Sequence, residues 1–190
     1  MIISLKLLLA SAFIFVIDAQ SQKAQTPTFP SAVERQFNRI ENDILSSAEV
    51  MPADKFDFTP ENLNIKESNF KGVRTFAGQI LHLATDNILI WSAVTGDKVR
   101  SDIEDVNGPK TIKTKAEVIK YLKDSFSLGR KAMYTLTDRN ALELIEFRGR
   151  HLTRLDLVFY ALTHANEHFG QMALYLRMNG IVPPPTITNN

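Results

Sequence analysis

The chain has 190 residues, of which 44% are hydrophobic and 23% charged, which is enough for one sizeable core and too little for several domains. Its 22 basic and 21 acidic residues give a formal net charge of +1, which disfavours binding to nucleic acid or to an anionic membrane surface. The absence of cysteine excludes disulfides, iron–sulfur centres and thiolate nucleophiles, and it leaves His, Asp and Glu as candidate metal ligands.

Residues 1–21 have the layout of a secretory signal peptide. Lys6 precedes an apolar run over residues 7–17, and Ala19-Gln20-Ser21 then places small residues at both key positions of a cleavage site. A membrane anchor is the alternative, but the run is shorter than the roughly 20 residues that span a bilayer. No cysteine follows it, so attachment as a lipoprotein is ruled out. We expect a mature chain that begins near Gln22, is exported to the periplasm or the extracellular space, and keeps no stable membrane anchor.

Residues 22–30 are polar and end in a proline, and we interpret them as a linker. A first helix is predicted from Ser31, a candidate N-cap with Glu34 at the capping-box offset, to about Met51. The following segment, residues 53–69, is interpreted as an ordered loop in which two phenylalanines, Phe56 and Phe58, anchor onto the core.

Helical spacing of apolar residues predicts a second helix from about Phe70 to Thr95, ending before Gly96. Residues 96–113 are polar and long enough to cross over between helices that do not form a tight hairpin. A third helix is predicted from Thr114, capped with the help of Glu117, and Gly129 is its expected weak point.

Residues 136–149 are interpreted as a mixed connection. The fourth helix is predicted to start within residues 151–153 and to stop at Asn179-Gly180 before a run of three prolines. Four amphipathic helices without credible strand pairs predict an all-α four-helix bundle over residues 31–185, followed by a tail at 186–190.

Three histidines lie at mid-helix positions of this bundle. His164 and His168 are four residues apart, which stacks both imidazoles at the edge of the apolar face of the fourth helix. His82 lies in the middle of the second helix, with Gln79 one turn before it and Asp86 one turn after it. If the three imidazoles converge, they can hold one divalent metal ion and leave a coordination position for water or substrate, a pattern typical of catalytic sites.

The alternative is that the three histidines are unrelated. The spacing from His164 to His168 also matches the H-x-x-E-H pattern of inverted zinc proteases, but no further Glu follows Glu167 to complete that ligand set. Glu167 and Asp86 are candidates to assist a metal-bound water, with outer or solvated roles favoured over direct ligation. His151, at the expected start of the fourth helix, is too far away to join the site.

Several stretches, in order along the chain, carry a family resemblance: Met51-Pro52-Ala53-Asp54-Lys55-Phe56-Asp57-Phe58-Thr59-Pro60, Val73-Arg74-Thr75-Phe76-Ala77-Gly78-Gln79-Ile80-Leu81-His82, His164-Ala165-Asn166-Glu167-His168-Phe169-Gly170-Gln171, Tyr175-Leu176-Arg177 and Gly180-Ile181-Val182-Pro183-Pro184. Over about residues 31–185 the chain resembles the DinB family of metal-dependent bundle enzymes. The resemblance implies an up-down-down-up helix path and a divalent ion on His82, His164 and His168, with zinc or nickel expected before iron or manganese.

The resemblance implies less about the reaction. Related enzymes include thiol-dependent S-transferases and isomerases that use cytoplasmic thiols, and an export signal conflicts with that chemistry. We therefore expect a hydrolase or transferase that acts on a small molecule, as a monomer or homodimer. The alternatives are a non-catalytic bundle that binds a metal or small ligand, and a metal that only joins two helices.

Overall fold

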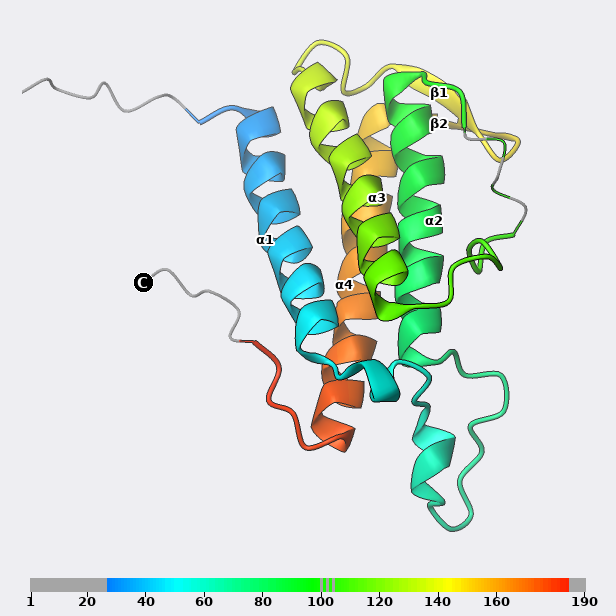
Figure 1. Cartoon of the computed structure of the whole chain (residues 1–190). Helices are drawn as coiled ribbons and strands as arrows, with labels where there is room; N and C mark the ends of the chain where they lie inside the picture. Colours follow the sequence, from blue (N-terminus) through cyan, green and yellow to red (C-terminus); the bar gives the residue numbers. More distant parts are fainter. Residues whose placement is uncertain (1–26, 100, 102, 104, 185–190) are drawn as a thin grey trace, which may run out of the picture.

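The computed structural model describes residues 27–99, 101, 103 and 105–184, and within them it contains four α-helices and one two-stranded sheet (Figure 1). The predicted signal peptide, residues 22–26 of the linker and the tail lie outside the described residues. The helices are α1 (Phe29–Val50), α2 (Phe76–Thr95), α3 (Lys115–Thr135) and α4 (Arg154–Met178); the strands are β1 (Leu144–Phe147) and β2 (Arg150–Thr153); two 3₁₀ turns cover Ala53–Lys55 and Pro60–Leu63.

The helices follow an up-down-down-up path. In Figure 1, α1 and α4 run in one direction and α2 and α3 in the other, and the long crossover between α2 and α3 descends along the outside of the bundle. α2 packs against α3 and α4, and α1 packs against the same two helices from the other side. The predicted all-α four-helix bundle with its long crossover is therefore confirmed. No helix in the described ranges combines the length and apolar character needed to cross a bilayer.

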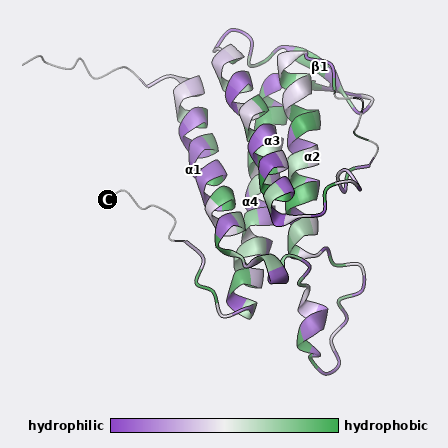
Figure 2. Cartoon of the chain, in the orientation of Figure 1, coloured by the Kyte–Doolittle hydropathy of each residue, from purple (hydrophilic) through white to green (hydrophobic). Residues whose placement is uncertain are grey.

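The core lies between the inward faces of the four helices. α2 carries more hydrophobic residues than α1 and α3 (Figure 2), because it is covered both by its neighbouring helices and by the crossover. At the centre, the Phe37 ring meets the rings of Trp91 and Phe126 edge-to-face, with centroids 5.7 and 5.8 Å apart. Gly129 of α3 faces this cluster, and a methyl group there would collide with the Phe37 ring. The predicted weak point of α3 is in fact a close-packing position.

Two helix starts differ from the predictions. α1 begins at Phe29 and is capped by a reciprocal pair of hydrogen bonds between Thr28 and Ser31, so the predicted cap at Ser31 with Glu34 is wrong. α2 begins at Phe76, six residues later than predicted, because Thr75 caps it through Gly78. A helical apolar period continues upstream of Thr75, but these residues form a turn.

The loop before α2 is anchored as predicted. Phe56 and Phe58 are both buried, and their carbonyls accept hydrogen bonds from the backbone N–H groups of Ala77 and Phe76. The Phe56 ring also packs against Phe76, with centroids 5.5 Å apart. These contacts satisfy N–H groups of the first turn of α2, which have no partner within the helix.

The connection before α4 contains a β-hairpin that the sequence reading missed. Phe147 pairs with Arg150 across a two-residue turn in which Arg148 and Gly149 have φ of +50° and +74°. The turn lacks the Asn-Gly or Asp-Gly pair that signals such hairpins. His151 consequently lies in β2 and not at the start of α4, which begins at Arg154.

The other predicted helix ends are confirmed. Thr114 and Glu117 form the capping box of α3. Thr153 caps α4 with Asp156, and α4 ends at Met178, with Asn179 as its C-cap and Gly180 following at a φ of +74°.

Candidate metal centre

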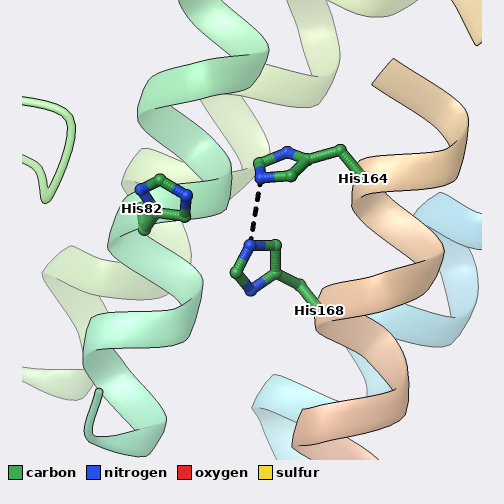
Figure 3. A group of neighbouring side chains, drawn as sticks. All are labelled: His82, His164 and His168. Atoms are coloured by element: carbon green, nitrogen blue, oxygen red, sulfur yellow. Dashed lines mark hydrogen bonds between the residues drawn. The ribbon is translucent and has the colours of Figure 1, made fainter. Parts of the chain in front are cut away.

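Three imidazoles meet between α2 and α4. His82 projects from α2 toward His164 and His168 of α4 (Figure 3). Each ring offers one nitrogen to a common space, and these nitrogens all lie within 4.8 Å of one another. Nε2 of His164 lies 3.1 Å from Nε2 of His168. The predicted convergence of the three histidines is therefore present, and three histidines this close can hold a metal ion.

The two histidines of α4 reach this space because of the local sequence. The apolar residues of α4 form a broad buried face that includes Leu157, Ala161 and Ala165. His168 follows at the edge of this face and is 4% exposed. His164, one turn earlier, is half-buried. The i, i+4 spacing therefore places both rings against α2, as the sequence indicated.

Two of the rings are held by hydrogen bonds on the side away from the shared space. Nδ1–H of His168 donates to Oε1 of Gln79 over 2.7 Å. Nδ1–H of His82 donates to the backbone carbonyl of Val106, in the crossover, also over 2.7 Å. Each bond fixes the proton on Nδ1 and so leaves the Nε2 lone pair of that ring free to bind a cation.

His164 is held differently. Its Nδ1 is buried and has no hydrogen-bond partner in the described part of the chain. The facing Nε2 of His168 carries a lone pair, so His164 donates its proton to that atom across 3.1 Å when no cation is present. A metal ion between the two Nε2 atoms would take the place of this proton. The donor set therefore fits a cation. Hydrogen bonds already fix the tautomers of His82 and His168, and only His164 has to release the proton on its Nε2.

Burial keeps two of the imidazoles neutral at ordinary pH. The pKa of His168 is lowered to about 3, first by burial and then by the charges of His164, His82 and Arg74. The pKa of His164 is also lowered, mainly by burial, and the nearby Asp86 carboxylate opposes this effect. Neutral imidazole is the form that binds a metal ion, so protons compete weakly at these two positions.

Comparison with known proteins identifies the family. The DinB family model matches residues 35–189. The chain belongs to the DinB family. The structure is similar to the crystal structure of a DinB-like protein from Bacillus cereus ATCC 10987, with a TM-score of 0.60 and 15% identity over 80% of this chain and 94% of the other. It is also similar to a conserved protein from Enterococcus faecalis, with a TM-score of 0.63 and 14% identity over 80% and 97% of the two chains. No curated protein matches the sequence significantly.

The acidic candidates of this DinB protein lie in different surroundings. Asp86 is buried, and its Oδ2 lies 3.7 Å from Nε2 of His164, while its Oδ1 accepts a hydrogen bond from Arg148 over 2.7 Å. Glu167 is exposed on the outer side of α4 and acts on His164 only through its charge. Asp86 is therefore placed to influence the site, and Glu167 is not placed to touch it.

Three supporting groups could not be found from spacing alone. Gln79 was noted only as a neighbour of His82 on α2, but its side chain binds His168 on α4. Val106 contributes a main-chain carbonyl, and no pattern of side chains in the sequence predicts such a contact. Arg148 reaches Asp86 from the hairpin turn, so it could be found only once the hairpin was known.

Proposed function

We propose that this protein binds one divalent metal ion on His82, His164 and His168 and uses it in a hydrolysis or group-transfer reaction on a small molecule. One observation carries the proposal: the free nitrogens of the three histidines share one space, and two of the rings are held from behind by Gln79 and Val106. Unrelated surface histidines would not be oriented in this way.

The donor set favours particular ions. Imidazole nitrogen suits zinc and nickel, followed by iron, and manganese more often takes oxygen ligands. Without cysteine, the chain offers no thiolate that would select a softer metal. Three nitrogen ligands leave at least one coordination position for an exogenous molecule, and an ion bound in this way supplies Lewis-acid chemistry. Asp86, whose Oδ2 lies 3.7 Å from Nε2 of His164, is placed to orient a ligand there.

A non-catalytic role is the second candidate, because Asp86 lies only 3.7 Å from Nε2 of His164. A shift of this carboxylate toward the ion would complete a four-ligand shell, which is typical of structural zinc. In that case the metal would join α2 to α4 without leaving room for a substrate. Spectroscopy of the cobalt(II)-substituted protein distinguishes the two candidates, since an added small anion changes the spectrum only if a position is open.

We also propose that the protein works outside the cytoplasm. This part of the proposal is supported by Lys6, the apolar run over residues 7–17 and the small residues that follow it. The measurement is the mass of the exported protein, expected to correspond to a chain that begins near Gln22. An intact Met1 on a membrane-bound product would contradict export by cleavage.

The test of the metal site is the metal content of protein purified without a histidine tag. We expect one equivalent per chain in the wild type and strong loss in His82→Ala, His164→Ala and His168→Ala. The matched control is His151→Ala, because His151 is exposed on β2 and lies outside the cluster. Full metal content in any of the three cluster variants would remove that residue from the ligand set.

A further inference from the structure

A pocket of about 370 Å³ lies between the β1–β2 hairpin and the start of α4. Its lining is formed by the side chains of Phe147, Arg148, Arg150, Leu152, Asp156 and Tyr160. This volume falls in the range of small-molecule sites, and a mixture of apolar walls with a few polar groups is typical of such sites.

Two residues connect this pocket to the candidate metal centre. Tyr160 precedes His164 by one turn of α4, and the two ring centroids are 5.7 Å apart. Arg148 donates to Asp86 over 2.7 Å, and Asp86 lies 3.7 Å from Nε2 of His164. A molecule in the pocket that contacts Tyr160 would therefore be separated from His164 only by the Tyr160 side chain.

The pocket offers two guanidinium groups to a ligand. Arg148 and Arg150 both line it, together with one carboxylate, Asp156. That carboxylate already accepts hydrogen bonds from the backbone N–H and the hydroxyl of Thr153 at the start of α4. Arg150 has no ion-pair partner among the residues that the structure describes, and the side chain of Arg148 is 44% exposed despite its bond to Asp86. With Asp86 included, the two arginines face two carboxylates, so Arg150 supplies the unpaired guanidinium and Arg148 a donor that it shares with Asp86.

The backbone conformation of Arg148 independently indicates that this residue has a role beyond forming the turn. Its φ of +50° lies in the left-handed region, where a residue other than Gly, Asn or Asp costs roughly 1 kcal/mol. An ordinary turn residue would fit this position better. The guanidinium stacks on the Phe147 ring at 5.0 Å and points toward the cluster. The hairpin therefore tolerates local strain at the residue that carries the charge.

We propose that this pocket binds the carboxylate of a small amphiphilic substrate of the metal centre, an inference that rests on the function proposed above. Arg148 and Arg150 bind the carboxylate, since the guanidinium fork matches its two oxygens. Phe147, Leu152 and the ring of Tyr160 contact an apolar body. Only one guanidinium of the lining, that of Arg150, has no carboxylate partner among the described residues, which matches a monoanion better than a phosphate dianion. The far end of the substrate extends past Tyr160 to the histidines.

The test uses 3-phenylpropionate as the probe, with the neutral 3-phenylpropionamide and phenyl phosphate as comparisons. Binding is measured by calorimetry and by NMR on the chain from residue 22, with and without zinc. We expect the carboxylate to bind about 10-fold more tightly than the amide, as a charge-assisted contact provides. Phenyl phosphate is expected to bind more weakly than the carboxylate.

Variants locate the binding. Arg148→Asn keeps a residue suited to the turn, and together with Arg150→Ala it should reduce carboxylate affinity about 10-fold for each change. Arg39→Ala is the matched control, because this arginine lies on α1 outside the pocket lining. Equal binding of acid and amide, unchanged binding in the double variant, or tighter arginine-dependent binding of phenyl phosphate would each overturn the proposal.

The two proposals can fail separately. Zinc stoichiometry is measured on the same samples as anion binding. Anion binding without zinc binding would refute the metal function alone. Zinc binding without preferential carboxylate binding would refute the pocket assignment alone.

Discussion

The side-chain oxygen of Gln79 lies 2.7 Å from Nδ1 of His168, so a residue of α2 sets the orientation of a histidine on α4. Both groups are buried, which shields the bond from competition with water. Gln79 also contacts the hydroxyl of Tyr175, another residue of α4, and that hydroxyl donates to the carbonyl of Arg74 over 3.0 Å. The candidate metal centre is thus supported by a polar connection between the two helices that carry it.

We expect Gln79→Leu to weaken metal binding by about 10- to 100-fold, because His168 loses the acceptor that holds its ring and its tautomer. The stoichiometry should remain one ion per chain, since all three histidines are retained. The measurement is a competition titration with a zinc chelator, and the control is Gln36→Leu at an exposed position on α1. Equal affinities for the two variants would show that the bond to Gln79 does not influence the metal.

His168 should make stability depend on pH even without metal. Its pKa is about 3 in the folded chain and about 6.5 in the unfolded chain, so between these values the unfolded chain binds more protons. Stability from this residue is therefore fully present above about pH 6.5 and declines as the pH falls toward 3. Each unit of difference in pKa between the folded and the unfolded chain corresponds to about 1.4 kcal/mol in the free energy of unfolding.

His168→Ala should remove both metal binding and much of this pH dependence, while the helices stay formed by their apolar faces. The measurement is thermal unfolding between about pH 5 and 8, with and without zinc, for the wild type, His168→Ala and the control His151→Ala. A His168→Ala protein that binds one zinc tightly and keeps the wild-type pH profile would show that His168 is not a ligand.

Two helical glycines should respond in opposite ways to alanine. A Cβ at Gly129 would collide with the Phe37 ring and lie 2.9 Å from Nε1 of Trp91, so Gly129→Ala should destabilise the fold by about 1–3 kcal/mol. A Cβ at Gly170, on the exposed side of α4, meets nothing within 4 Å, so Gly170→Ala should stabilise it by up to about 1 kcal/mol. Urea unfolding measures both. A stabilising Gly129→Ala would contradict the close packing at Gly129, and a destabilising Gly170→Ala would contradict the open surface at Gly170.

Lys115 should stabilise the end of α1. Its ammonium donates to the carbonyls of Glu49 and Met51, each over 2.7 Å, and so satisfies acceptors that a helix end leaves unpaired. We expect Lys115→Met to cost about 1–2 kcal/mol in the free energy of unfolding. Lys120→Met is the control, since Lys120 is exposed and pairs only with Asp124 one turn away. Equal losses would indicate a general charge effect.

Much of the fold could be predicted because its signals are local. Helical apolar periods, the Thr114–Glu117 box and the Asn179–Gly180 stop each depend on neighbours in the sequence. The predicted start of α2 lies too early because the apolar period continues upstream of Thr75, where the chain forms a turn, whereas Thr75 caps the first turn of the helix. The hairpin was missed because Arg148 occupies a turn position that usually holds Asn or Asp.

The candidate site was predictable only in part. The sequence shows the spacing of His164 and His168 directly, and the mid-helix position of His82 made it possible to predict that the three side chains converge. Their supports are not local. Gln79 contacts a residue 89 positions away, and Arg148 reaches Asp86 across 62 positions. Such partners follow from helix packing and hairpin placement, which single-sequence patterns do not encode.

The acceptor for His82 is a main-chain carbonyl, that of Val106 in the crossover. A side-chain replacement at this position leaves the carbonyl in place, so an alanine scan would not detect its role. That role depends on the path of the crossover and not on the identity of the side chain. Insertions or deletions between Gly96 and Thr114 are therefore expected to displace this acceptor from the candidate metal centre, even though the sequence of this connection is largely polar.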